Sequence, residues 1–248
     1  MELIYSCLFF IFGIIIGSFL NVCIYRIPRE ESIVITGSHC PHCGHFLKPY
    51  DNIPLISYLF LGGKCRHCKK PISLRYPLVE LITGLLFVAN YLQLGLTFHL
   101  LLNLILTCTL IIITFIDIDT LIINDRFHVI ISALAIMKLV TSPDLLQSSL
   151  IGAFIISIPF LLIAGLTGGL GGGDVKLMAV AGLYLGWQNV LVSFFIASIT
   201  GGLYAIYLIL FKKQGRKAEM PFGPFLCLGI LIASLYATEL INWYMGLM

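Results

Sequence analysis

The sequence predicts an all-α protein: a polytopic membrane bundle of about eight transmembrane helices with a small cytoplasmic zinc-binding loop module. Only 11% of the 248 residues are charged and 59% are hydrophobic, whereas a soluble domain carries about 25% charged residues. Apolar runs recur along the chain, and several approach the roughly 20 residues that cross a bilayer. They lack the two-residue alternation of barrel strands, so helices are predicted.

The predicted spans follow the apolar runs in chain order. They cover residues 3–25, 77–94, 98–116, 121–140, 147–167, 175–187, 189–211 and 222–246. The first run has no basic segment before it and no small-residue cleavage site before Arg26, which favours a retained helix over a signal peptide. Arg126 and His128 interrupt the fourth run. A turn at 186–189 divides the long run 175–211, and seven spans is the alternative count.

The distribution of lysine and arginine predicts the orientation, because short cytoplasmic loops are enriched in these residues. Eight of the fifteen lie in residues 26–76 and four in 212–217. With eight spans, Arg126 and Lys176 fall on the same side, and only Lys138 falls on the other. The 26–76 loop is therefore predicted to face the cytoplasm, with both chain termini outside.

The one sizeable polar insert, residues 26–76, contains two C-x2-C pairs separated by 21 residues. The predicted metal ligands are Cys40, Cys43, Cys65 and Cys68. Four thiolates complete a tetrahedral site and leave no open position, so the pattern predicts a structural zinc ion. A module of about 50 residues also lacks the area for a self-sufficient core, so a metal would help it fold.

Two alternatives remain for this module. Two disulfides would require the loop to face outside, against its positive charge, and the cytosol disfavours disulfides. A histidine could also replace one thiolate; the candidates are His39, His42, His45 and His67. Membrane topology and attraction to lipid already explain the positive charge of the loop, so no nucleic-acid partner is predicted.

Acidic residues are rare and gather in two places. The stretch FIDIDTLIINDR places Asp117, Asp119 and Asp125 at the end of the third span and in the following turn, and GGGDVK places Asp174 at the start of the sixth. Both places lie on the cytoplasmic face in the predicted topology. An ionisable group at membrane depth costs a few kcal/mol, which indicates a function. The alternative is that these acids are interfacial helix caps.

Asp117, between apolar neighbours, and Asp174, behind three glycines, are the strongest functional candidates. Two carboxylates in a partly dry site resist simultaneous ionisation and share a proton. One can activate a water molecule while the other donates to a substrate carbonyl, as in aspartic proteolysis. Glycines beside an acid leave room for a substrate backbone. No G-x-S-x-G or H-E-x-x-H motif is present, and the glycine run lacks the preceding strand of a dinucleotide-binding loop.

The chain resembles the type IV prepilin peptidases, which are membrane-embedded GxGD aspartic proteases. The shared motifs, in order, are GSFLNVCIYRIP, CPHCGH, DNIPLISYLFLGGKCRHCKKPISLRYPLVE, IDID with Asp125, GGGDVKL and PFGPFL. The resemblance implies that Asp117 and Asp174 form the catalytic pair. It implies cleavage of the short basic leader from prepilins or pseudopilins at the cytoplasmic face of the bacterial plasma membrane. Family members commonly have proline where this chain has Asn124, so a shifted turn is expected before Asp125.

The resemblance also implies methylation of the new N-terminal amine with S-adenosylmethionine, at a site that the residues do not identify. Three segments are expected: a first transmembrane helix (1–25), the cytoplasmic four-cysteine zinc module (26–76) and a membrane aspartic peptidase bundle (77–248). A proton- or cation-coupled transporter using the same acids is one alternative, although no repeated halves are evident. A non-enzymatic membrane scaffold, with the zinc loop recruiting a partner, is another.

Overall fold

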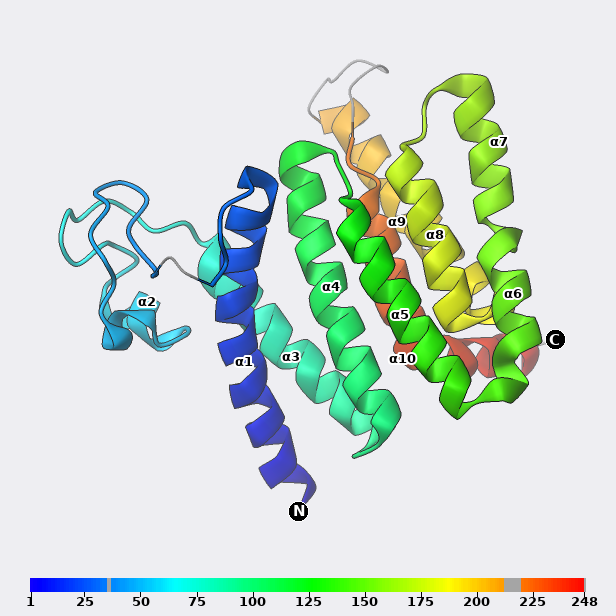
Figure 1. The fold of residues 1–248 in the computed structure, drawn as a ribbon, viewed down its shortest axis with the longest axis horizontal. Helices are drawn as coiled ribbons and strands as arrows, with labels where there is room; N and C mark the ends of the chain where they lie inside the picture. Colours follow the sequence, from blue (N-terminus) through cyan, green and yellow to red (C-terminus); the bar gives the residue numbers. More distant parts are fainter. Residues whose placement is uncertain (35–36, 212–219, 248) are drawn as a thin grey trace. The chain divides into compact units, whose positions relative to one another are not determined.

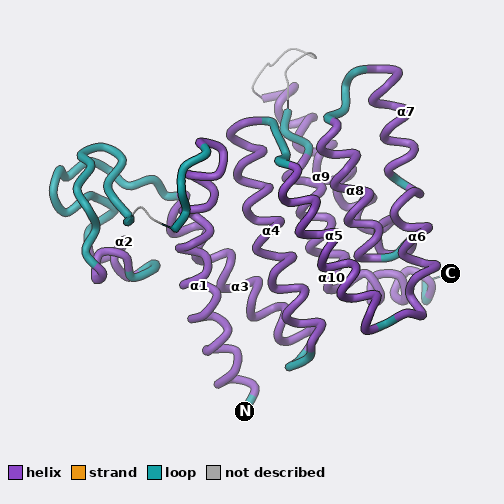
Figure 2. The backbone as a smooth tube through the Cα atoms, viewed as in Figure 1, coloured by secondary structure: helices purple, strands orange, loops and turns teal. Residues whose placement is uncertain are grey.

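The computed structural model describes residues 1–34, 37–211 and 220–247, and within these ranges it contains helices and two isolated β-bridges but no strand. The α-helices are α1 (Glu2–Arg26), α2 (Ile56–Phe60), α3 (Arg75–Leu94), α4 (Phe98–Thr120), α5 (Asp125–Thr141), α6 (Leu146–Ile155), α7 (Ser157–Thr167), α8 (Gly172–Leu185), α9 (Trp187–Phe211) and α10 (Gly223–Met245). Short 3-10 turns occupy Ile27–Arg29, Pro49–Asn52 and Pro143–Leu145. The all-α prediction is confirmed (Figures 1 and 2).

Six segments are long and apolar enough to cross a membrane, and they make the chain an integral membrane protein. They are Glu2–Arg29, Arg75–Leu94, Phe98–Thr120, Pro143–Thr167, Trp187–Phe211 and Gly223–Met245. Helices α5 and α8 have 17 and 14 residues, fewer than the roughly 20 that span the hydrocarbon core without help. The count of eight spans therefore stays a prediction.

Two of the predicted runs are divided in the structure. The run 147–167 becomes α6 and α7, which meet at Ile156. Pro159 explains the break, because proline cannot donate the backbone hydrogen bond that would continue α6 into α7. The predicted division near residue 186 is confirmed: α8 ends at Leu185, and Gly186 follows with a φ of 84°.

The chain forms two compact units, Met1–Ile112 and Ile113–Met248. In the first unit, α1 packs along α3 through small residues. A Cβ atom on Gly13 would lie 2.7 Å from the Cα of Gly84, so the two helix backbones can approach only without side chains at this level. A buried polar set joins α3 to the start of α4: Asn103 donates to Asn90 at 2.7 Å, and Asn90 donates to Thr107 at 3.2 Å.

In the second unit, α8 is the central helix and contacts α5, α6, α7, α9 and α10. Figure 1 shows α8 between α5 and α7. Leu177, Met178 and Ala181 of α8 are fully buried. A Cβ atom on Gly182 would fall well inside van der Waals contact with the carbonyl of Gly152 on α6. This close packing of glycines holds the short helix that begins at the GGGD motif.

The structure does not test two of the predictions. The basic loop predicted at 212–220 falls, except for Met220, outside the described residues. The three predicted segments, 1–25, 26–76 and 77–248, stay a prediction, since the two compact units divide the chain within α4 on a different criterion.

Candidate active site and metal centre

Asp117 lies in the last turn of α4 and is buried, with 4% of its surface exposed. Its Oδ2 atom accepts a hydrogen bond of 3.1 Å from the backbone N–H of Gly223. Gly223 is the first residue of α10, where N–H groups have no partner within the helix and the helix dipole favours an anion. A Cβ atom on Gly223 would lie 2.6 Å from the same oxygen, so only glycine fits here.

Asp174 lies in the first turn of α8, and the N–H of Gly171 bonds its carboxylate. The carboxylates of Asp117 and Asp174 interact electrostatically. Buried Cys227 of α10 interacts with both. The second unit therefore gathers the two predicted acids, one from the end of α4 and one from the start of α8.

The turn between α4 and α5 packs into the same region through Ile123. A Cβ atom on Gly173 would lie 3.0 Å from the Cβ of Ile123, and one on Gly223 would lie 3.3 Å from its Cδ1. Ile123 thus packs against one glycine in the first turn of α8 and one in the first turn of α10. The third glycine of GGGD is needed for this internal contact, whereas a Cβ atom on Gly172 would meet nothing within 4 Å. The open side of the motif is therefore at Gly172.

A second polar group supports the backbone just before Asp174. The Nε2 atom of buried His128 lies 3.2 Å from the carbonyl oxygen of Gly173, and its Nδ1 atom lies 3.2 Å from Oδ1 of Asp125. Lys176 donates to both oxygens of Asp125 at 2.8 and 3.0 Å. These contacts tie the first turn of α5 to the first turn of α8.

The other acids of the first cluster do not join the buried pair. Asp119 and Asp125 are both exposed. Asn124 is the N-cap of α5, and its side-chain oxygen accepts from the N–H of Arg126 at 3.1 Å. Asparagine is a favoured N-cap, so it starts the helix at the position where family members commonly have proline.

Sequence reasoning assigned no role to two contributors to this region, His128 and the N–H of Gly223. His128 was interpreted only as an interruption of an apolar run, although a histidine in such a run could have been flagged. Gly223 lies within PFGPFL, where a glycine directly before a proline at a helix start was the available signal.

In the first unit, the two C-x2-C pairs form matching turns. Cys40 donates its N–H to His45 and accepts from Gly44; Cys65 donates to Lys70 and accepts from Lys69. Isolated bridges close both turns, His39 to Phe46 and Lys64 to Pro71. The fifth position of each turn has a positive φ: 69° at Gly44 and 60° at Lys69. Glycine relieves this strain in the first turn, and a lysine tolerates it in the second.

The four thiols converge as a metal site requires. The Sγ atoms of Cys40, Cys43, Cys65 and Cys68 all lie within 4.8 Å of one another. The Cys40 and Cys68 atoms are 3.9 Å apart, close to the roughly 3.8 Å between thiolates bound to one zinc at 2.3 Å and far from the roughly 2.05 Å of a disulfide. The backbone N–H groups of Cys68 and His67 lower the pKa of Cys65 to about 7, which favours the thiolate that binds metal.

In the part of the chain that the structure describes, no histidine belongs to this cluster of metal ligands. His45 and His67 instead stack on each other, with ring centroids 4.6 Å apart. The arrangement of four free cysteines supports the four-thiolate prediction over the alternatives with a histidine ligand or with disulfides.

Comparisons with known proteins agree with both regions. Residues 104–206 match the model of the type IV leader peptidase family, and residues 11–94 match that of the bacterial peptidase A24 N-terminal domain. The chain is 36% identical over 237 residues to the prepilin leader peptidase/N-methyltransferase of Bacillus subtilis (strain 168), covering 95% of this chain and 96% of that protein.

Two further relatives carry the same name. The protein of Aeromonas hydrophila is 34% identical over 273 residues, covering 98% of this chain and 94% of its own length. That of Legionella pneumophila is 32% identical over 268 residues, covering 95% and 93%. No solved structure matches the chain. The resemblance stated from the motifs is confirmed, and the transporter alternative finds no support among these relatives.

Proposed function

Because the chain belongs to the type IV leader peptidase family, we propose that it cleaves the leader peptide from type IV prepilins or pseudopilins and then methylates the new N-terminal amine. The protein is an integral protein of the bacterial inner membrane. We further propose that the active site and the four-cysteine module face the cytoplasm, since most lysines and arginines fall on that side of the predicted topology.

The observation that carries the peptidase proposal is the electrostatic pairing of buried Asp117, which accepts the first N–H of α10, with Asp174 in the first turn of α8. In the proposed reaction, one carboxylate takes a proton from a water molecule as its oxygen attacks the scissile carbonyl carbon. The other, protonated, donates to the carbonyl oxygen, and collapse of the intermediate breaks the C–N bond as the amine gains a proton. The N–H of Gly223 orients Asp117 for this exchange.

The four thiols are proposed to hold one structural zinc ion. Their separations fit a tetrahedral site, and four protein ligands leave no position for substrate. The ion would join two turns that lie 21 residues apart in sequence and so stabilise a module that is mostly loop (Figure 2). We propose the 26–76 segment as this zinc module and the segment 77–248 as the peptidase bundle.

The methyl-transfer proposal rests on the names of the relatives, which imply S-adenosylmethionine as the donor. That cofactor supplies a methyl group on a sulfonium, which an uncharged amine can accept while the sulfur keeps the bonding electrons. The protein has to hold the cofactor, position the amine and exclude competing water. The carboxylate pair is already assigned to peptide cleavage, so a separate binding site is required.

Single replacements of Asp117 and Asp174 by asparagine test the peptidase assignment. Asparagine keeps the size of each side chain but cannot act as a base, so we expect cleavage of a prepilin in membranes to be abolished. Asp119→Asn, in the same IDID motif but exposed, is the matched control and should cleave normally. Full processing by the Asp117 or the Asp174 variant would refute the role of that residue.

A further inference from the structure

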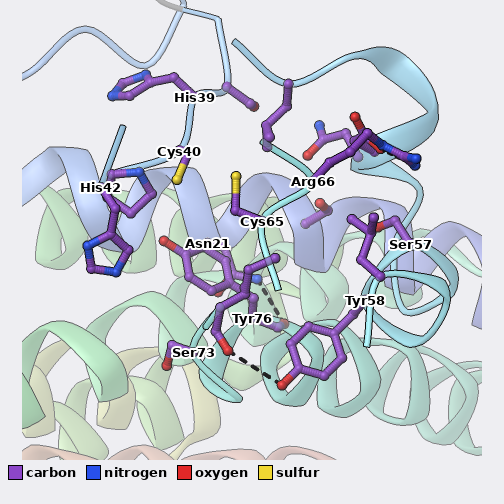
Figure 3. Close-up of a pocket in the computed structure, with 18 of the residues that line it drawn as sticks. Asn21, His39, Cys40, His42, Ser57, Tyr58, Cys65, Arg66, Ser73 and Tyr76 are labelled. Atoms are coloured by element: carbon purple, nitrogen blue, oxygen red, sulfur yellow. Dashed lines mark hydrogen bonds and ion pairs between the residues drawn. The ribbon is translucent and has the colours of Figure 1, made fainter. Parts of the chain in front are cut away.

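The short helix α2 of the four-cysteine module has an exposed apolar end that the proposed function does not use. Leu59 and Phe60, its last two residues, are 77% and 88% exposed, and we call them the apolar tip. The residues before them face the other way, because Ser57 and Tyr58 line a pocket between the module and the helices α1 and α3 (Figure 3). The helix therefore has a partly polar face turned inward and an apolar face turned outward.

A hydrogen bond ties the start of α2 to the membrane-spanning helix α3. Oε2 of buried Glu80 accepts the N–H of Leu55, the residue directly before α2, at 2.8 Å. Leu55 has a φ of 60° and a ψ of −49°, a conformation that is strained for a residue with a Cβ atom. Such strain persists only where surrounding contacts hold it. The bond to Glu80 therefore fixes the point from which α2 projects.

That point lies beside the middle of α1, well before its end. A Cβ atom on Gly17 would lie 2.7 Å from the Cα atom of Glu80. At about 1.5 Å per residue, Gly17 lies about 14 Å before Arg26, the last residue of α1. The 25 residues of α1 measure about 38 Å, so a centred helix extends only about 4 Å beyond each side of a hydrocarbon core of about 30 Å. The start of α2 is therefore at the depth of the lipid.

The side chains of α1 at the same level are themselves apolar and exposed. Ile15 and Phe19 are 52% and 48% exposed, as expected for a spanning helix that faces acyl chains. Because α2 has only five residues, or about 8 Å, the apolar tip stays close to this level. Figure 1 shows α2 beside the middle turns of α1 rather than beyond its end. Lipid is thus the medium that reaches Leu59 and Phe60.

Positive charge accompanies the apolar tip. Lys64, Lys69 and Lys70 follow it within the module, and all three are exposed. Apolar side chains next to lysines are typical of segments that lie in the membrane interface, where the apolar groups enter the acyl boundary and the ammonium groups reach anionic headgroups. Long lysine side chains can extend to the headgroups from a residue that lies deeper. A bilayer with anionic lipid therefore matches both the tip and its charges.

We propose that Leu59 and Phe60 insert into the boundary between headgroups and acyl chains, and so dock the four-cysteine module on an anionic bilayer. The module then has a third attachment to the membrane, besides its covalent links to α1 and α3. The inference goes beyond the proposed peptidase and methyl-transfer activities. It also holds on whichever side of the membrane the module lies.

The experiment compares Phe60→Trp with the control Phe46→Trp, using the full chain in lipid nanodiscs. Phe46 belongs to the same module and is 64% exposed, but it lies level with the end of α1. Its Cδ1 atom would lie 3.4 Å from a Cβ atom on Gly37, and the carbonyl of Gly37 accepts from Arg26 at 3.1 Å. The emission of the unmodified chain, which has two tryptophans, is subtracted. Melting temperatures equal to that of the unmodified chain show that both variants are folded.

Two quenchers distinguish lipid from water. In nanodiscs of phosphatidylcholine and phosphatidylglycerol, lipids brominated along the acyl chain should remove most of the added emission of Phe60→Trp, and aqueous iodide should remove little. Phe46→Trp should show the opposite pattern. Quenching of Phe60→Trp mainly by iodide would mean that water surrounds the tip, and quenching by neither would mean that protein covers it. Either result, or equal bromine quenching in the two variants, would overturn the inference.

The role of the lysines is tested by the lipid composition. Without phosphatidylglycerol, bromine quenching of Phe60→Trp should weaken, and Lys64→Gln combined with Lys69→Gln and Lys70→Gln should remove this dependence. Quenching that is the same in both lipids would overturn the contribution of anionic headgroups.

The unmodified chain gives an independent check. A phospholipid with a photoreactive diazirine in its acyl chain should label the peptide that contains residues 56–61 as well as the spanning helices. Labelling of the spanning helices without that peptide would overturn the proposed insertion.

Discussion

Replacing Gly223 with alanine perturbs the proposed peptidase site at a single backbone contact. The new Cβ atom would lie 2.6 Å from Oδ2 of Asp117, so the carboxylate has to move away and lose the N–H bond of 3.1 Å. A hydrogen bond to a charged group contributes about 1.5–3 kcal/mol. If the reaction uses this bond fully, kcat/KM for cleavage should fall by roughly 10- to 150-fold.

The assay is cleavage of a purified prepilin in proteoliposomes, with thermal unfolding of each variant measured in parallel. Gly202→Ala is the control, because a Cβ atom there would meet nothing within 4 Å, and it should cleave normally. Methylation of a peptide that is already cleaved should persist in Gly223→Ala, since the carboxylate pair is proposed to act in peptide cleavage and not in methyl transfer. A kcat/KM within threefold of the unmodified chain would refute the reasoning.

Three other outcomes follow from the packing and the metal cluster. Gly182→Ala should lower stability by about 1–3 kcal/mol through overpacking, seen as a lower melting temperature, while Gly165→Ala, which would meet no neighbour, should melt normally. Cys40→Ser should reduce zinc from about one ion per chain to well below half, measured by elemental analysis. The control is Cys7→Ser, because Cys7 is an exposed residue of α1 outside the cluster. Equal zinc content in the two variants would contradict the proposed zinc site. His128→Ala should lower kcat for prepilin cleavage by about tenfold with KM little changed, because the carbonyl of Gly173, just before the proposed catalytic residue Asp174, loses its partner. His128→Gln, which keeps a donor, should recover part of that rate, and equal losses in the two variants would argue for a purely structural histidine.

The sequence was sufficient for the helices because their burial in lipid is encoded locally. An apolar run long enough to span the bilayer leaves a chain few choices, since every backbone group has to be bonded within the helix. The four-cysteine cluster was predictable for a similar reason, as the ligand spacing is itself the signal. The break between α6 and α7 was missed because mean hydropathy does not register the hydrogen bond that Pro159 removes.

The detailed construction of the carboxylate site depended on tertiary packing. The sequence predicted that Asp117 and Asp174 lie on one membrane face, but their separation of 57 residues along the chain carries no information on how their side chains are held. The N–H of Gly223 is a backbone group that every residue except proline possesses, so its role appears only when α10 starts beside α4. The support from His128 likewise exists only because α5 packs on α8.

The contact between Gly152 and Gly182 constrains the evolution of this fold. Each position already carries the smallest side chain, and a Cβ atom on either would collide with the backbone of the opposite helix. The colliding atoms belong to the backbone, so no second mutation can make them smaller, as it could with a side chain. A substitution at one position therefore cannot be compensated at the other. We expect related proteins to keep both glycines while the lipid-facing residues around them vary.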